Sequence, residues 1–179
     1  MHWIWWVVGA VVLLGVAAFA YGIYLVRRSL QQAVHESHKV TRDQFPELVN
    51  EGILVYRDKL NIDIDLDDPE ASAKAISDGF DRFDELKAAF ATEDFWWRFV
   101  LPTGALIAEF FCLHGNGELE QEEDGEWAIK IPFADGEDGA TTFPFAKSIK
   151  QATEGDPGDV YAYLICSLKL EETLKAAGH

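Results

Sequence analysis

Three residues of catalytic type lie close together in the segment LPTGALIAEFFCLHGNGE, residues 101–118. Glu109, Cys112 and His114 interrupt an apolar run that ends at glycines. A cysteine hydrolase needs a base oriented against its thiol. His114 is two residues beyond Cys112, so on a continuing helix the two side chains point about 200° apart. The spacing therefore predicts a buried helix with a core cysteine and a histidine near its C-terminal end.

A buried carboxylate at position 109 needs a partner, because an unpaired charge in a protein interior is costly. Arg98 stands in the preceding aromatic segment EDFWWRFVL, residues 93–101. We expect Glu109 to form a structural pair with Arg98 or with a lysine of the sheet, and recognition of a ligand is the alternative. The segment also has the length of a second membrane span, but Arg98, Pro102 and Glu109 make that costly. A pair of buried helices on either side of Pro102 is the prediction.

Alternating aspartates in NIDIDLDDPEAS resemble the start of an EF-hand calcium loop, with Asp63, Asp65 and Asp67 at the expected spacing. Such a loop requires glycine at its sixth position and glutamate at its twelfth. Asp68 and Lys74 occupy those positions, so the calcium motif fails. The segment instead predicts that Asp68 is the N-cap of a helix whose first residue is a proline.

The remaining candidate patterns also favour structural roles. His35 and His38 form an H-x-x-H pair without a third ligand, and metal sites need three or four. Cys112 and Cys166 both stand in apolar surroundings, which predicts two small core residues. The sequence contains no glycine-rich phosphate loop and no HExxH motif. We expect no catalytic residue, no metal and no cofactor.

Residues 3–26 form an almost unbroken apolar run of 24 residues without a charged side chain. At about 1.5 Å per residue this run reaches roughly 36 Å, enough to cross a hydrocarbon core of roughly 30 Å. Aromatic residues that prefer the membrane interface stand near both ends: Trp3, Trp5, Trp6, Tyr21 and Tyr24. The pattern predicts a transmembrane anchor at 1–26, a helical stalk at 27–44 and a soluble domain at 45–179.

Positive side chains follow the apolar run and none precedes it; they are Arg27, Arg28, Lys39 and Arg42. A cleavable signal peptide is the rival interpretation because of Ala18-Phe19-Ala20, but signal peptides carry their positive charge first. The positive-inside rule places the N-terminus outside and the domain in the cytoplasm. With the opposite orientation the domain would be periplasmic. Gly15, Ala18 and Gly22 share one helical face, which favours packing against another membrane helix.

Charge is concentrated in the second part of the chain. Residues 61–179 contain 26 acids and nine bases, a net charge of −17. Such a surface disfavours nucleic acid and favours a basic protein partner. The densest acidic segment is GELEQEEDGEW, whose carboxylates are Glu118, Glu120, Glu122, Glu123, Asp124 and Glu126. We expect these six to form a partner-binding surface, and a solvated hairpin without a partner is the alternative.

Hydrophobic periodicity predicts an α+β domain, mostly helical with a small antiparallel sheet. The expected helices cover residues 45–60, 69–92, 93–101, 103–113, 146–153 and 160–177. The expected strands cover residues 126–133 and 140–145, with ADGEDG as the turn between them.

The stretch from residue 101 to about 171 resembles a loose group of small bacterial α/β domains of unknown function. The pattern combines a helix bearing glycine and glutamate, a strand with tryptophan, a phenylalanine-proline strand end and a lysine-bearing short helix. The matching positions here are Gly104, Glu109, Trp127, Phe143, Pro144, Lys147 and Lys150. Such domains occur among immunity-like and accessory proteins, so the resemblance implies a binding role. For a bacterial protein, the apolar run at residues 3–26 predicts a location in the inner membrane.

The hypothesis that follows is a non-enzymatic, single-pass membrane protein whose acidic cytoplasmic domain binds another protein. It would serve as an accessory subunit of a membrane complex or as an immunity-type inhibitor. Two alternatives are a membrane-tethered hydrolase using Cys112 or Glu109, and a sensor of cations or other ligands using the acidic hairpin.

Overall fold

A computed structural model describes residues 2–90, 92–133 and 139–169 of the chain. The chain divides into two compact units, of which the first ends at Gln32 and the second begins at Ala33. The compact domain thus includes residues that the sequence assigned to a stalk. The predicted last helix extends to residue 177, and its end lies outside the described residues.

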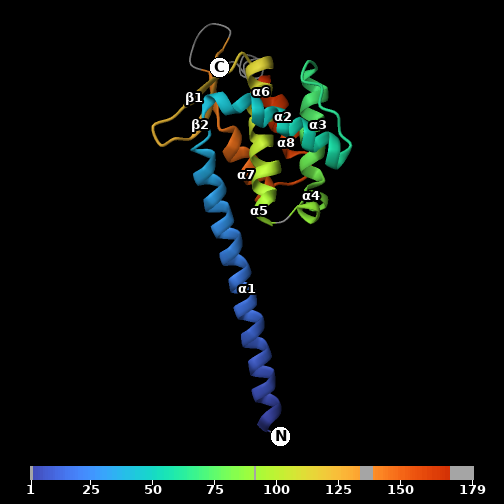
Figure 1. Ribbon diagram of the computed structural model, residues 1–179, viewed down its shortest axis with the longest axis vertical. Coiled ribbons are helices and arrows are strands. Elements are labelled where there is room, and N and C mark those ends of the chain that lie inside the picture. Colours follow the sequence, from blue (N-terminus) through green and yellow to red (C-terminus); the bar gives the residue numbers. More distant parts are fainter. Residues whose placement is uncertain (1, 91, 134–138, 170–179) are drawn as a thin grey trace, which may run out of the picture. The chain divides into compact units, whose positions relative to one another are not determined.

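The first unit consists of most of helix α1 (His2–Ser37), which is continuous (Figure 1). The helix contains no proline, and its last turn is closed by Ser37, whose hydroxyl donates to Val34 O at 2.7 Å. A short turn and the 3₁₀ helix η1 (Arg42–Gln44) follow. The predicted helical stalk over 27–44 is therefore correct as far as Ser37 and wrong beyond it.

The second unit is α+β, mostly helical with a three-stranded antiparallel sheet. Its helices are α2 (Phe45–Val55), η2 (Tyr56–Leu60), α3 (Pro69–Asp81), α4 (Phe83–Ala89), α5 (Thr92–Phe95), η3 (Trp96–Val100), α6 (Leu101–His114), α7 (Pro144–Glu154) and α8 (Asp159–Leu168). The strands are β1 (Glu118–Gln121), β2 (Trp127–Ile131) and β3 (Ala140–Thr142), in the order β1-β2-β3. The predicted fold class of this unit is confirmed.

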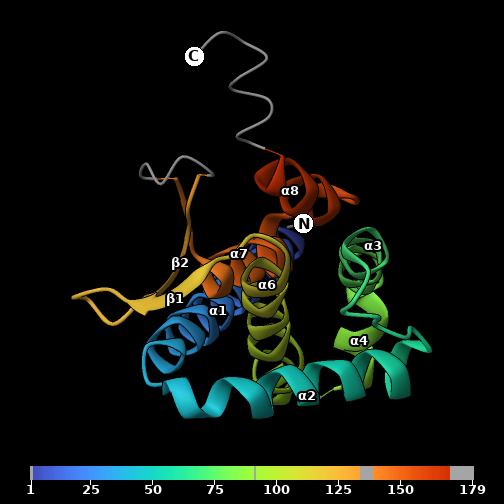
Figure 2. The same ribbon diagram turned by 90° about the horizontal axis from the view of Figure 1, so that it is seen from above.

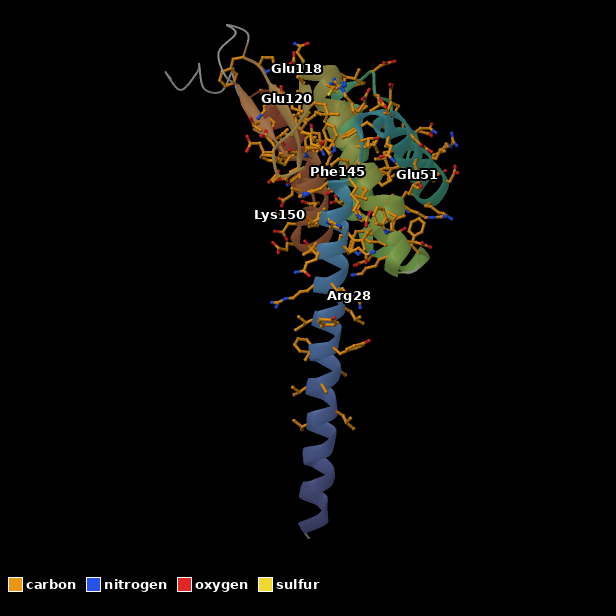
Figure 3. The ribbon with its side chains drawn as sticks, turned by 60° about the vertical axis from the view of Figure 1, so that its left-hand side comes forward. Arg28, Glu51, Glu118, Glu120, Phe145 and Lys150 are labelled. Atoms are coloured by element: carbon orange, nitrogen blue, oxygen red, sulfur yellow. The ribbon has the colours of Figure 1, made fainter. Side chains whose placement is uncertain are left out.

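Helix α6 forms the centre of the second unit, and α2 and α7 pack against it (Figure 2). Ten of its residues, including Leu106 and Phe110, are buried. Close packing with α7 is possible because position 104 is glycine: a Cβ there would lie 2.5 Å from Phe145 Cδ1. Phe145 is labelled in Figure 3, where it lies within this core. Sheet and α3 lie on opposite sides of α6 (Figures 1 and 2).

Tyr56, at the end of α2, joins three elements of the core. It is fully buried, and its hydroxyl donates to Ile76 O in α3 at 3.1 Å. Thr103 Oγ1 in α6 donates to the same hydroxyl at 3.4 Å. Helix α3 can approach this ring because position 79 is glycine, where a Cβ would meet the Tyr56 ring. The buried hydroxyls of Tyr56 and Thr103 are thus paired, as burial requires.

Several predicted elements differ from the structure. The helix expected over 69–92 is broken at Arg82, whose Nη1 donates to Leu60 O at 2.5 Å. The two helices expected around Pro102 are one continuous helix from Trp96 to His114. A π-helical segment, η3, leads directly into α6, and Pro102 follows at the second position of α6. Strand β1 was expected only as the entry to a hairpin. The strand expected over 140–145 ends at Thr142, because Pro144 begins α7.

The segment Trp96–His114 is long and apolar enough to cross a membrane by length and composition. Within the residues searched, it is the stretch that meets this criterion, and 67% of its window is buried inside the chain. Burial of this kind is typical of the core helix of a domain, as expected for this segment.

Candidate functional site

The catalytic-type residues of the segment 101–118 lie on α6 and at its end without forming a catalytic group. His114 Nε2 lies 3.0 Å from Leu66 O, and its ring packs against Phe110 with centroids 5.1 Å apart. Cys112 is half-buried and free. His114 is thus engaged by a backbone carbonyl and an aromatic ring, and no described contact joins it to Cys112.

Electrostatics at Cys112 oppose a nucleophilic role. Burial raises the pKa of its thiol, and the neighbouring carboxylate of Glu109 raises it further, with Arg42 partly offsetting both. A raised pKa lowers the fraction of reactive thiolate. Cys166 on α8 is exposed, so the prediction of a core position is wrong for Cys166. On the short helix α8 the side chain simply falls on the outer face.

Arg98 and Glu109 do not form the predicted pair among the described residues. Both lie on the continuous helix Trp96–His114, eleven positions apart, which corresponds to about 16 Å along the axis. Arg98 is exposed and Glu109 is half-buried. The separation explains the result, because a pair of side chains on one helix meets at a spacing of three or four.

The small-residue face of α1 is exposed within the described structure. Gly15, Ala18 and Gly22 are all exposed, and a Cβ built at either glycine would meet no atom within 4 Å. Packing of this face against another membrane helix stays a prediction.

His35 is exposed and His38 is half-buried. The described residues contain no group of three or more histidine, cysteine or acidic side chains placed to hold a metal ion. His38 instead faces the turn of the acidic hairpin, which we define as residues 118–131. A Cβ at Gly125 would lie 3.3 Å from His38 Cβ, and the φ angle of +90° at Gly125 independently favours glycine.

The acidic hairpin brings together the six carboxylates that the sequence singled out. Strands β1 and β2 pair with Glu118 opposite Lys130 and Gln121 opposite Trp127. Glu118 and Glu120 are exposed on β1 (Figure 3). The turn is closed by bonds from Glu122 N to Glu126 O and from Gly125 N to Glu122 O, at 2.8 and 2.9 Å.

Two side chains attach the hairpin to the segment that follows α1. Trp127 Nε1 donates to Val40 O at 2.8 Å. Gln121 Nε2 donates to His38 O at 3.2 Å and to Gly125 O at 3.0 Å. These bonds hold the acidic turn in a defined position. Glu122 and Glu126 are half-buried there, and the other four carboxylates are exposed.

Four of the six carboxylates surround one surface depression of about 580 Å³, lined by Glu122, Glu123, Asp124, Glu126, Lys130, Thr141 and Phe143. Lys130 Nζ pairs with Glu122 Oε1 at 2.5 Å. Burial raises the pKa of Glu126, and the charges of Asp124 and Glu122 raise it further, against a lowering effect of His38. Crowding of like charge at this turn means that a cationic group placed there would be stabilised.

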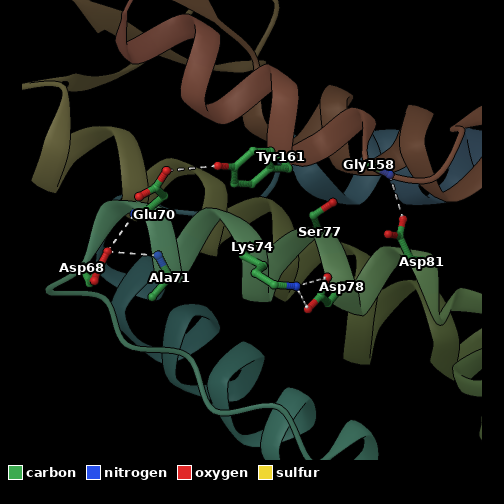
Figure 4. A pocket seen from close by; sticks show the side chains of 9 residues that line it. All are labelled: Asp68, Glu70, Ala71, Lys74, Ser77, Asp78, Asp81, Gly158 and Tyr161. Atoms are coloured by element: carbon green, nitrogen blue, oxygen red, sulfur yellow. Dashed lines mark hydrogen bonds and ion pairs between the residues drawn. The ribbon is translucent and has the colours of Figure 1, made fainter.

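A second acidic site, which the sequence did not predict, lies between α3 and α8. We call it the α3–α8 groove; its volume is about 630 Å³ (Figure 4). Its lining residues are Asp68, Glu70, Ala71, Lys74, Ser77, Asp78, Asp81, Gly158 and Tyr161. The predicted N-cap is confirmed here: Asp68 accepts from Glu70 N and Ala71 N at 2.9 and 3.0 Å.

Hydrogen bonds connect the two helices on either side of the groove (Figure 4). Tyr161 Oη donates to Glu70 Oε1 at 3.4 Å, and Gly158 N donates to Asp81 Oδ1 at 3.1 Å. Lys74 Nζ pairs with Asp78 Oδ2 at 2.8 Å. The polar face of α3 could have been predicted from the sequence, because its polar residues recur at spacings of three and four. Its pairing with α8 could not, because the two helices are far apart in the chain.

No family model matches the chain, and no curated protein and no solved structure matches it. The resemblance of residues 101–171 to small bacterial domains therefore stays a prediction.

Proposed function

We propose that the chain is a non-enzymatic, single-pass membrane protein whose acidic domain binds a basic protein partner in the cytoplasm. It acts as an accessory subunit of a membrane complex or as an immunity-type inhibitor. The observation that carries the proposal is the exposure of large apolar side chains along α1. An apolar helix surface that the protein does not cover is stabilised by a bilayer.

Support for the anchor comes from individual side chains between residues 12 and 25. Leu14 and Phe19 are 71% and 72% exposed, and Val12, Val16 and Tyr21 are also more than half exposed. Arg27 and Arg28 follow and are exposed, as expected for residues at the cytoplasmic interface. Gly15, Ala18 and Gly22 offer a contact surface for a second membrane subunit.

Support for a basic partner comes from the acidic hairpin. Its turn carries four carboxylates around one depression, and Lys130 is the base among the residues that line it. Complementary charge accelerates association and selects partners more than it adds affinity. The exposed ring of Phe143 at the edge of the depression supplies an apolar contact.

Membrane extraction tests the anchor. We expect the full-length chain to stay in the membrane pellet after alkaline carbonate treatment. The variant Leu14→Arg, Phe19→Arg should shift it to the supernatant, because a charge at the centre of a span costs about 2.5–3.5 kcal/mol. Release of the unmodified chain would contradict the anchor. A C-terminal reporter fusion checks the cytoplasmic orientation.

Purification from membranes in mild detergent tests the partner. We expect a stoichiometric partner that is lost in the variant Glu122→Gln, Glu123→Gln, Asp124→Asn. The matched control Glu47→Gln, Asp84→Asn, Asp94→Asn removes the same charge from other exposed positions and should retain the partner. Recovery of the chain alone, or equal loss in both variants, would contradict binding by the hairpin.

The hydrolase alternative receives no support from the geometry around Cys112. Its thiol has a raised pKa, and His114 is engaged elsewhere. The ligand-sensor alternative is supported by a different feature from the hairpin, the acidic α3–α8 groove.

A further inference from the structure

The floor of the α3–α8 groove contains a polar group without a partner. Ser77 is 3% exposed and lines the groove. Its hydroxyl makes no hydrogen bond to another described residue, and in Figure 4 it points into the space between α3 and α8. A serine in a helix commonly bonds to the carbonyl four residues earlier. The unused hydroxyl of Ser77 is therefore available to a ligand that enters the groove.

Charge around this hydroxyl is strongly negative. The carboxylates of Asp68, Glu70, Asp78 and Asp81 line the groove against one lysine, Lys74. Lys74 is already paired with Asp78. Glu70 and Asp81 accept hydrogen bonds from neutral donors, Tyr161 Oη and Gly158 N. The charge of Lys74 acts on Asp78 and on Asp81, so one base faces four acids. A cationic ligand is the class that this lining stabilises.

The spacing of the carboxylates distinguishes between kinds of cation. Glu70 and Asp81 are eleven positions apart on α3, about 16 Å along the helix axis. A metal ion needs several ligands converging within about 2.6 Å, and the described residues hold no such group. A ligand whose cationic groups are separated by flexible apolar links can reach carboxylates spread over this distance.

We propose that the α3–α8 groove binds a linear aliphatic polyamine, with one ammonium group on Ser77 Oγ and the others beside Glu70 and Asp81. An ammonium donates up to three hydrogen bonds, so it can engage the Ser77 hydroxyl and a carboxylate together. The ring of Tyr161 forms an apolar wall for the methylene links. A volume of about 630 Å³ is sufficient for a ligand of this size.

This site is distinct from the acidic hairpin, because β1 and α3 lie on opposite sides of α6 (Figure 2). The inference therefore does not depend on a protein partner or on the membrane anchor. It can hold where the proposed function fails, and the proposed function can hold where this site binds nothing.

Calorimetry with spermidine tests the site. The full-length chain in a non-ionic detergent is titrated at an ionic strength of about 0.15 M, which screens long-range attraction. We expect saturable binding of one spermidine per chain. Ser77→Ala should raise the dissociation constant about tenfold, since the hydroxyl bonds to a charged group. Glu70→Gln, Asp81→Asn should raise it at least as much, while amide oxygens keep the bonds to Tyr161 and Gly158.

The variant Glu122→Gln, Glu123→Gln is the matched control, because it removes the same charge from the hairpin. It should change the dissociation constant less than about twofold. Equal weakening by hairpin and groove variants would show general attraction to an acidic protein and overturn the site. Absence of saturable binding up to about 1 mM spermidine would overturn it as well. An unchanged constant in Ser77→Ala, with an unchanged urea midpoint, would exclude an ammonium at Ser77.

Discussion

Helix α6 and the segment of α1 between residues 12 and 25 have similar apolar side chains and opposite surroundings. Leu106 and Phe110 on α6 are fully buried, whereas Leu14 and Phe19 on α1 are 71% and 72% exposed. Composition alone marks both as apolar helices, so it does not determine which one a domain encloses. The difference lies in the neighbours that the rest of the chain supplies.

Helix α6 is enclosed because α2 and α7 pack closely against it. Glycines permit the approach: a Cβ at Gly52 would lie 2.7 Å from Leu106 Cδ1, and one at Gly104 would lie 2.5 Å from Phe145 Cδ1. In the described structure, a Cβ at Gly15 or Gly22 of α1 would meet nothing within 4 Å. Gly52 and Gly104 therefore have a packing role beside α6, and no such role is described for Gly15 or Gly22 of α1.

The largest expected difference is between the effects on stability of removing one phenylalanine ring from each helix. Phe110→Ala should lower the free energy of unfolding of the domain by about 3–5 kcal/mol, because it leaves a cavity in the core. Phe19→Ala should change it by less than about 0.5 kcal/mol, because that ring is exposed. Urea denaturation of both variants, followed by tryptophan fluorescence, measures the difference. Similar losses would mean that α1 also packs in the domain core.

Glycine substitutions sharpen the same comparison with a smaller change. Gly104→Ala adds a methyl group where Phe145 leaves no room, and overpacking of this kind costs about 1–3 kcal/mol. Gly15→Ala adds the same group in open space and should leave the domain unfolding midpoint unchanged. An unaltered midpoint in Gly104→Ala would contradict the tight contact of α6 with α7.

The sequence predicts the local elements of this fold better than their junctions. The N-cap at Asp68 and strand β2 follow from capping and from alternation. The expected strand over 140–145 is too long, because Pro144 begins α7. The break at Arg82 was not predicted; there the guanidinium donates to Leu60 O, which is distant in the chain. Strand β1 is equally hidden, because its alternating glutamates resemble a solvated segment until β2 pairs with it.

The candidate sites divide in the same way. The six hairpin carboxylates lie within nine residues, 118–126, so the sequence alone shows them as a cluster. The α3–α8 groove combines residues from two helices that are separated by most of the domain, and Ser77 carries no sequence signal of its own. The proposed pair of Arg98 and Glu109 failed for a local reason, since Pro102 does not interrupt the helix that carries both.

The burial of Tyr56 in the core beside α6 can be tested by the pH dependence of stability. Burial raises the pKa of its hydroxyl, with a smaller opposing effect of the bond from Thr103. The unfolded chain loses this proton above about pH 10 while the folded chain keeps it, so the stability is present below that pH and is lost as the pH rises. We expect a slope of up to about 1.4 kcal/mol per pH unit from this group. Tyr56→Phe should reduce the slope in alkaline urea titrations, and an unchanged slope would contradict its burial.

The smallest expected effect is a difference in alkylation rate between the two cysteines. It tests how far the thiol of Cys112 on α6 is buried. Cys112 is half-buried with a raised pKa, and Cys166 on α8 is exposed. At near-neutral pH, iodoacetamide should therefore modify Cys166 first and Cys112 several-fold more slowly, as followed by mass spectrometry of peptides. Cys166→Ser should leave a single slow reaction. Rapid modification of Cys112 in that variant would require an accessible thiolate beside Glu109, and it would revive the nucleophile that the geometry of α6 opposes.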